Sequence, residues 1–185
     1  MPDIAVSPFA PATFPKLPAI AGLRLAAMAA GERYRRRADL TLAELAPGST
    51  IAGVFTRSTM PGAPVLWCRK HIGRGRARAI VINAGNANVF TGRQGMDDVA
   101  ATAQAVAAAV GCKPGEVMVA STGVIGETLS VGRLLRAVPG LHGKLKAQGW
   151  NAAARAICTT DTYPKGASAQ AEIDGKIIRI AGIAK

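Results

Sequence analysis

VMVASTGVIGE, residues Val117 to Glu127, is the stretch of the sequence that says most about the fold. It opens with four apolar residues, Val117–Ala120, whose length and β-branched content are typical of a buried strand. A Ser-Thr-Gly sequence follows at once, and Gly123 can adopt backbone angles that a Cβ would forbid. We therefore expect a sharp turn at Ser121–Gly123 that leaves backbone N–H groups pointing outward. Two such groups converging on one point form an oxyanion hole for acyl transfer, and the alternative is an ordinary strand-to-loop turn.

The composition is that of one globular domain with a small appendage. Hydrophobic residues make up 49 % of the 185 residues and charged residues 18 %, which excludes a disordered chain. The net charge of +12 suggests a nucleic-acid partner, but the basic residues lie in two short runs, Arg33–Arg37 and Arg69–Arg78, without zinc-finger or helix-turn-helix spacing. Aromatic residues for base stacking amount to only 4 %. A solvated surface, or charge balanced by an acidic partner chain, is the better interpretation.

The cysteines and the N-terminus bear on the compartment. Cys68, Cys112 and Cys158 are odd in number and far apart, so they outline neither a disulfide framework nor a metal-binding CxxC pair. We therefore expect a reducing cytoplasm and no metal. The N-terminus has no secretory signal, and the longest apolar stretch, Ala103–Val110, is too short to span a bilayer.

Periodicity and turn residues predict a proline-rich N-terminal arm, residues 1–21, followed by a domain over residues 22–185. Strands are expected at Gly22–Met28, Thr50–Thr56, Ala63–Trp67, Ala79–Asn83, Val117–Ala120, Ser168–Ile173 and Lys176–Ile183, the last two joined by an Asp174-Gly175 turn. Helices are expected at Leu40–Leu45 (a single turn with Thr41 as N-cap), Asp97–Val110, Val131–Val138 and Lys146–Ile157, with stops at Gly111 and at Pro139-Gly140.

Two polar segments follow apolar elements. Residues Ala84–Asn88 form either a turn stapled by its own amide side chains or a loop that orders the neighbouring Thr122-Gly123 site. Residues Cys158–Lys165 are crowded with hydroxyls, and their simplest interpretation is a helix exit capped by threonines.

The sequence offers no histidine in a position that favours a histidine-based catalytic mechanism. His71 and His142 lie far from the hydroxyl-rich segments and have no metal-ligand spacing, so we expect both at the surface. The nucleophile and base would then come from another chain. An N-terminal threonine or serine uses its own α-amine as base after proteolysis of a precursor. The sequence stops at Lys185 directly after an apolar strand, as such a cut would leave it.

Four motifs in the same order make the sequence resemble the ornithine acetyltransferase family, the bifunctional glutamate N-acetyltransferases of arginine biosynthesis. The motifs are INAGNAN (Ile82–Asn88), ASTGVIG (Ala120–Gly126), TTDTYPK (Thr159–Lys165) and GIAK (Gly182–Lys185). The resemblance runs from about Gly22 to the last residue. It implies an α/β fold, a layered α+β sandwich shared with self-processing aminopeptidases, and the strand–helix alternation is compatible with it.

The resemblance also implies a partner and an assembly. In that family a precursor cuts itself at a threonine shortly beyond the lysine that corresponds to Lys185. The resulting α and β chains stay together, usually as α2β2, and this sequence resembles the α chain. The nucleophilic threonine would lie on the β chain.

Residue by residue, the resemblance implies an oxyanion hole at Thr122 and Gly123, and substrate contacts at Thr159 and Lys185. Asn88 and Asp161 would give structural support. A ping-pong reaction would move acetyl from N-acetylornithine to glutamate through an acyl-enzyme, with no cofactor, no nucleic acid and no membrane involved. Whether acetyl-CoA also serves as a donor stays open.

Two other functions remain as alternatives. A self-processing aminopeptidase or amidohydrolase on the same scaffold would pass the acyl group to water instead of glutamate. A basic nucleic-acid-binding module would rest on the runs Arg33–Arg37 and Arg69–Arg78.

Overall fold

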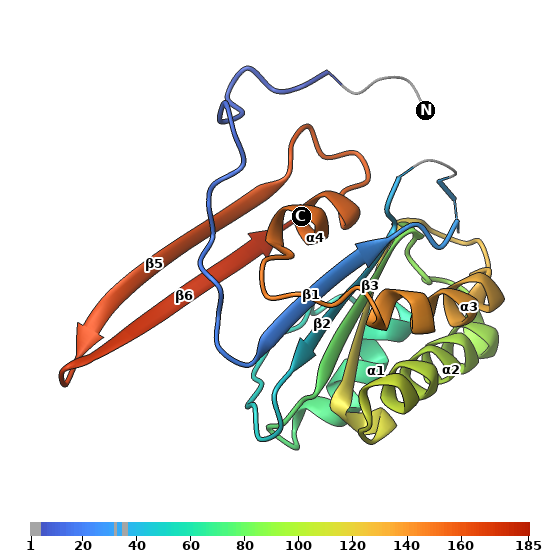
Figure 1. Cartoon of the computed structure of the whole chain (residues 1–185). Coiled ribbons are helices and arrows are strands. Elements are labelled where there is room, and N and C mark those ends of the chain that lie inside the picture. Colours follow the sequence, from blue (N-terminus) through green and yellow to red (C-terminus); the bar gives the residue numbers. More distant parts are fainter. Residues whose placement is uncertain (1–4, 32, 35–36) are drawn as a thin grey trace.

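The computed structural model describes residues 5–31, 33–34 and 37–185 of the chain (Figure 1). Its elements are, in chain order, β1 (Leu23–Met28), β2 (Leu40–Leu45), α1 (Ala63–Ile72), β3 (Ala79–Asn86), α2 (Gly92–Val110), the 3-10 turn η1 (Pro114–Glu116), β4 (Val117–Val124), α3 (Val131–His142), α4 (Trp150–Ala156), β5 (Lys165–Ile173) and β6 (Lys176–Ala184). A four-stranded sheet in the order β1-β2-β3-β4 forms the centre, and β5 and β6 form a separate hairpin. Helices α1, α2 and α3 lie on one face of the sheet, while α4 and the hairpin lie on the other side (Figure 1).

The sheet is mixed. Strands β1, β2 and β3 pair antiparallel, whereas β3 and β4 pair parallel through the crossover helix α2, as a parallel pair requires. The main core lies between the sheet and α1–α3, and its completely buried side chains include Leu40, Leu42, Val106 and Leu141.

The second face of the sheet carries a smaller cluster. Leu25 of β1 packs there against Trp150 of α4 and Leu17 of the arm. The register places Ala43, Ile80 and Met118 in one row with Leu25 across the four strands. Because side chains alternate along a strand, every second residue of β4 after Met118 points to this same face.

Residues Leu40–Leu45 form a strand, so the predicted helical turn is wrong. The segment β2 is paired on both sides, with β1 and β3, and Leu40 and Leu42 are fully buried on the helix-covered face. Thr41, the expected N-cap, is instead a buried residue on the opposite face. A short apolar segment fits a helix or a strand equally well. Here hydrogen-bond pairing of residues 40–45 with β1 and β3 outweighs the local N-cap pattern.

The two strands predicted on either side of the Pro61-Gly62 turn are also wrong. Thr50 makes only an isolated bridge with Arg76, and no strand follows it up to Thr56. Residues from Ala63 form α1, with a proline in the first turn, where a missing N–H costs nothing.

Helix α3 continues through Pro139, where the sequence predicted a stop. The last turn is held because Leu141 is completely buried and the N–H of Gly143 donates to the Pro139 carbonyl at 3.0 Å. Helix α4 is correspondingly shorter than the predicted Lys146–Ile157.

Several predicted elements are confirmed. Strand β1 matches its predicted bounds within one residue, and α2 ends at Gly111, whose φ of 73° and ψ of 51° form a left-handed cap. The hairpin turns at Asp174 and Gly175, both with positive φ. Strands β3 and β4 are each longer at the carboxyl end than predicted, which shapes the site described below.

Of the predicted arm, residues 5–21 are described and residues 1–4 lie outside the described part. The described arm contains no helix or strand, as predicted. It is anchored by Leu17, which is 4 % exposed, and by Trp150, whose indole N–H donates to the Pro18 carbonyl at 2.8 Å. Within the described residues, no helix has the length and apolar character needed to cross a membrane.

Candidate functional site

The carboxyl ends of β3 and β4 meet at two glycines. Gly85 pairs with Gly123, and Gly123 has φ of 138°, which favours glycine. A Cβ at Gly123 would lie 2.3 Å from the carbonyl carbon of Gly85, so no other residue fits this approach. The predicted turn directly after Ala120 is wrong, because β3 extends to Asn86 and offers β4 a partner as far as Val124.

The outer edge of β4 is marked by two hydrogen bonds from α1. The Trp67 indole donates to the Val117 carbonyl at 2.9 Å, and the Cys68 thiol donates to the Val119 carbonyl at 3.2 Å. At the end of the strand the Val124 carbonyl instead accepts the Ala87 N–H, at 2.8 Å, on the side of β3. The backbone carbonyls of Val117 and Val119 thus point away from β3, whereas the backbone carbonyl of Val124 points toward β3.

This alternation decides which backbone N–H groups of Thr122 and Gly123 are free of strand pairing with β3. Backbone groups of every second residue point to the same side of a strand, so the Gly123 N–H points to the outer edge and the Thr122 N–H points to β3. Two adjacent N–H groups do not both point outward here, contrary to the expectation drawn from a turn. By the same alternation the Thr122 side chain lies on the face of Met118, in register with the rows that include Ile80, and its hydroxyl is a further hydrogen-bond donor at this end of β4.

A chain of buried amides ties this corner together. Asn83 accepts the Ser121 hydroxyl at 2.6 Å and donates to the Asn86 carbonyl at 2.9 Å. Asn86 in turn donates to the Glu127 carbonyl at 3.1 Å and accepts the Asn88 N–H at 2.7 Å.

The amide motif is therefore more than a self-stapled turn. Asn83 and Asn86, 4 % and 2 % exposed, bond across to β4 and to the segment after it, so they hold the Gly123 corner in place. Asn88 is completely buried, donates to the Gly95 carbonyl and accepts the Thr91 hydroxyl. The sequence predicts that the amides of residues 84–88 form hydrogen bonds. Which amide bonds to which partner depends on the tertiary structure.

A second cluster forms around Asp161, in the segment after α4. Its carboxylate accepts the Thr159 N–H at 3.1 Å, the Lys165 ammonium at 3.0 Å and the Lys185 ammonium at 3.1 Å. Burial raises the pKa of the Asp161 carboxyl, but the three hydrogen bonds outweigh burial and lower the pKa to about 2. The structure thus brings the predicted residues Thr159 and Lys185 together, and Asp161 is the side chain that joins them.

The loop after β1 contacts residues next to both clusters. Arg33 pairs with Glu127 at 2.9 Å, next to the Gly123 corner, and Arg37 donates to the carbonyl of Cys158, next to Thr159. Arg35 and Arg36, of the predicted basic run, lie outside the described residues.

These intramolecular partners argue against the nucleic-acid interpretation. Arg37 also stacks on the Tyr34 ring at 4.2 Å, and Arg69 of the second run donates to the Thr56 carbonyl. A guanidinium committed to a carbonyl or carboxylate of its own chain is less available to a phosphate backbone.

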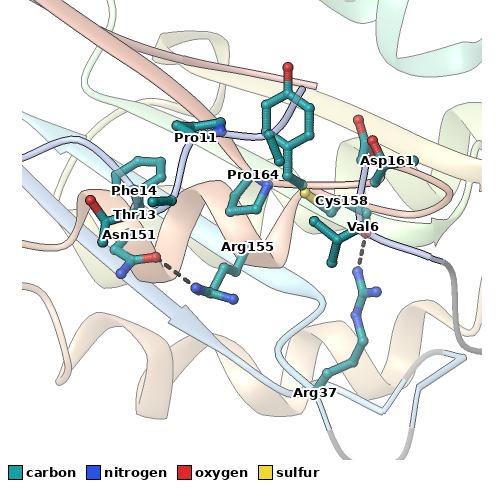
Figure 2. A pocket seen from close by; sticks show the side chains of 14 residues that line it. Val6, Pro11, Thr13, Phe14, Arg37, Asn151, Arg155, Cys158, Asp161 and Pro164 are labelled. Atoms are coloured by element: carbon teal, nitrogen blue, oxygen red, sulfur yellow. Dashed lines mark hydrogen bonds between the residues drawn. The ribbon is translucent and has the colours of Figure 1, made fainter. Parts of the chain in front are cut away.

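A cavity of about 750 Å³ adjoins the Asp161 cluster, between the arm, α4 and the segment 158–164 (Figure 2). Arg37 and Arg155 line it, and the Arg155 Nε donates to Asn151 at 2.9 Å (Figure 2). Of the predicted site residues, Thr122, Gly123, Thr159 and Lys185, none lines this cavity.

The histidines take no part in either cluster. His71 is 8 % exposed, so its predicted surface position is wrong, and its ring lies 4.4 Å from that of Trp67 in the helix layer. His142 is partly exposed and lies 4.0 Å from Glu44. In the described part of the chain, the two clusters therefore contain donors and cations but no histidine base.

Comparison with known proteins identifies the family. A model of the ArgJ family matches residues 24–185. The arginine biosynthesis bifunctional protein ArgJ of Gluconobacter oxydans is 52 % identical over 98 % of this chain, and that of Agrobacterium fabrum is 48 % identical over 99 %. These matches cover 43 % and 44 % of the relatives, so the chain spans less than half of their length.

Solved structures agree with the sequence relatives. The ArgJ protein of Bacillus halodurans superposes with a TM-score of 0.84 at 30 % identity, covering 89 % of this chain and 86 % of that chain. The ornithine acetyltransferase of Mycobacterium tuberculosis, solved in complex with ornithine, superposes with a TM-score of 0.81 at 37 % identity, covering 89 % and 88 %. The α/β fold expected from the resemblance is confirmed. By the family match and by relatives at about half identity over nearly its whole length, this chain belongs to the ArgJ family.

Proposed function

We propose that this chain is the α chain of a glutamate N-acetyltransferase that moves acetyl from N-acetylornithine to glutamate through an acyl-enzyme. The observation that carries the proposal is the end of β4, where the strand register directs the Gly123 N–H away from β3. The family match and the ornithine complex of the Mycobacterium tuberculosis neighbour support this substrate class over a hydrolase on the same scaffold.

In the proposed mechanism, Thr122 and Gly123 stabilise the negative oxygen of each tetrahedral intermediate. Donors fixed in advance are effective because they need no reorganisation as the charge develops. The glycine–glycine approach and the buried amides fix the position of Gly123, so the donor is rigid. The reaction needs no cofactor of its own, and acetyl-CoA would enter, if at all, as an acetyl donor.

Thr159 and Lys185 are the proposed substrate contacts of the chain. The Lys185 side chain is 31 % exposed and its ammonium pairs with one oxygen of Asp161, so it retains donors for the carboxylate of an amino-acid substrate. Asp161 acts as a positioning residue, because it holds Lys185 and the Thr159 backbone in one place. Its low pKa keeps it ionised throughout the physiological range.

The nucleophile is proposed to lie on a β chain released from the same precursor by autocatalytic cleavage, with an N-terminal threonine and an α2β2 assembly. Two observations support a composite site: the chain spans less than half of its relatives, and the described residues of the two clusters include no histidine that could act as the base. A cytoplasmic location is proposed with it, consistent with free thiols at Cys68, Cys112 and Cys158.

The test is acetyl transfer by the assembled enzyme carrying Thr122→Val. Loss of one oxyanion donor is expected to lower kcat about 100- to 1000-fold with little change in KM. Thr50→Val, an exposed threonine remote from both clusters, is the matched control and should leave kcat unchanged. A Thr122→Val enzyme within about threefold of wild type would remove Thr122 from the mechanism, since a lost donor costs at least about 100-fold. Acetylornithine hydrolysis faster than transfer to glutamate would favour the hydrolase.

A further inference from the structure

The cavity beside the Asp161 cluster contains two arginines from different parts of the chain. Arg37 comes from the loop after β1 and Arg155 comes from α4, and both side chains line the cavity. Figure 2 shows the two guanidinium groups on the same side of Cys158 and Pro164. The tertiary structure therefore brings two permanent positive charges to one hollow.

Each arginine keeps N–H donors that the described part of the chain does not use. Arg155 donates through Nε to Asn151 at 2.9 Å, and its two terminal amino groups have no hydrogen-bond partner among the described residues. Arg37 donates through one terminal amino group to the Cys158 carbonyl and lies over the Tyr34 ring. A guanidinium has five N–H donors in a planar fork that matches a carboxylate or a phosphate. A small anion needs only the donors that remain, unlike an extended phosphate backbone.

The charge balance around the cavity also favours an anion. Among the described lining residues the only carboxylate is Asp161, and it is already paired with the ammonium groups of Lys165 and Lys185. With Arg37 and Arg155, these residues carry four positive charges against one negative charge. A hollow with such an excess concentrates anions from solution.

The N-terminal arm supplies an apolar part of the cavity wall. Its lining residues are Val6, Ala10, Pro11, Ala12, Thr13 and Phe14. The Phe14 ring lies so close to the start of β5 that a Cβ at Gly166 would be 2.7 Å from it. Leu17, three residues further on, is buried, so this end of the arm is fixed by packing on the rest of the chain. A bound molecule would therefore meet guanidinium groups and apolar carbon in one cavity.

We propose that this cavity binds a small organic anion whose phosphate or carboxylate group is held by Arg37 and Arg155, and whose apolar body contacts the arm. The anion is neither the donor nor the acceptor of the acetyl group. The inference does not depend on the proposed function, because none of the proposed substrate contacts lines the cavity. The bound anion would touch the guanidinium that holds the Cys158 carbonyl, next to Thr159.

The test measures binding to the assembled enzyme by isothermal titration calorimetry. The probes are phenyl phosphate and phenylacetate, which share an apolar ring and differ in the anionic group, with benzyl alcohol as the neutral control. We expect at least one of the two anions to bind with a Kd below about 1 mM, and benzyl alcohol not to bind. The anion that binds more tightly identifies the natural ligand as a phosphate or a carboxylate.

Two variants locate the bound anion. Arg155→Gln should weaken binding at least about tenfold, because it removes charged donors. Arg93→Gln removes the same charge from an exposed position outside the cavity and should bind as wild type does. Ala12→Glu brings a carboxylate to the arm side and should also weaken binding about tenfold, whereas the neutral Ala12→Gln should not. Because Arg155 and Ala12 are both exposed, none of these changes should lower the melting temperature, which separates lost binding from misfolding.

Several outcomes would overturn the proposal. They are no binding of either anion, equal binding of benzyl alcohol, and equal losses in Arg155→Gln and Arg93→Gln. A KM for glutamate that rises in Arg155→Gln in parallel with the loss of probe binding would also overturn it, because the arginines would then serve the acceptor substrate. Probe binding that depends on Arg155, in an enzyme that transfers no acetyl, would leave this site intact and refute the proposed function.

Discussion

The four-stranded sheet and the β5–β6 hairpin are built from similarly apolar strands, but they use them in opposite ways. In the sheet, Leu40, Leu42 and Val81 are at most 1 % exposed beneath α1–α3. In the hairpin, Ile173 and Ile180 are 57 % and 68 % exposed. The sheet is thus stabilised by burial within this chain, whereas the hairpin leaves apolar side chains exposed in the described part of the chain.

The proposed site residues come from both regions. Thr122 and Gly123 belong to the self-contained sheet, and they are held by backbone pairing and buried amides. Lys185 follows the hairpin and is held by one ion pair with Asp161. The proposed oxyanion donors are therefore held more firmly by this chain than the proposed substrate contact Lys185 is.

The sharpest test of this comparison pairs one apolar truncation from each region. Leu42→Ala should destabilise the chain by about 2–5 kcal/mol, because it opens a cavity in a completely buried site. Ile180→Ala should change the stability of the free chain by less than about 0.5 kcal/mol, because the side chain is exposed. Chemical denaturation of both variants measures the difference, and equal losses would show that the hairpin is already buried.

A second test concerns the strain stored at the end of the sheet. Gly123→Ala should cost about 1–3 kcal/mol from its positive φ, with a further loss because the new Cβ meets the Gly85 backbone. Gly126→Ala is the control, with φ of 84° but open space around the Cβ, and should cost about 1–2 kcal/mol. Thermal unfolding ranks the two, and a Gly126→Ala variant as unstable as Gly123→Ala would contradict the close approach.

A third test addresses the ion pairs beside the hairpin. The pKa of Asp161 is lowered from 3.8 to about 2, so the folded state favours the carboxylate and its contribution is present above pH 4. That contribution is lost as the pH falls through 2. We expect about 1–2 kcal/mol, below the full value of the pKa change, because the ammonium groups of Lys165 and Lys185 are partly solvated. Stability of wild type and Asp161→Asn measured from pH 6 to pH 2 should converge at the acid end, and parallel curves would contradict the assignment.

The smallest expected effect is the pH dependence of stability caused by His71, in the helix layer that covers the sheet. Burial, with the charges of Arg74 and Lys70, lowers the pKa of His71 below 6.5, so the folded state favours the neutral ring. The unfolded chain then binds the proton more readily, and stability should decline as the pH falls below 6.5. His71→Phe keeps a ring beside Trp67 without the titration, so its stability should be flatter between pH 7 and pH 5. Thermal melts across this range test it, and identical profiles would exclude His71 as the cause.

The elements predicted correctly from the sequence are those with strong local signals. The Asp174-Gly175 hairpin turn and the glycine cap of α2 need a particular backbone geometry that few residues supply. Leu40–Leu45 and Ala63–Trp67 were mispredicted because short apolar runs fit a helix and a strand equally well locally. Pairing partners more than thirty residues away in sequence decided the first of these.

The candidate site likewise has features that the sequence predicts and features that depend on the tertiary structure. The Thr-Gly pair and the hydroxyl-rich segment stand out from the residue types alone. Which donors face outward could not be predicted, because that depends on β3 extending to Asn86 and pairing with β4 as far as Val124. The cavity lined by Arg37 and Arg155 is not predicted either, because Arg37 is interpreted as part of a solvated surface and nothing in the local sequence singles out Arg155, which is distant from it along the chain.

The sequence by itself determined the family, the glycine at position 123 where the strands approach closely, and the residues that carry the proposed chemistry. Those properties depend on residue identity and on short-range spacing. Only the tertiary structure decided that Thr159 and Lys185 meet at Asp161, that one N–H of the Thr122-Gly123 pair faces outward, and that the hairpin turns its apolar face away from the body. These depend on strand register and on long-range packing, where a shift of one residue reverses the face that each side chain occupies.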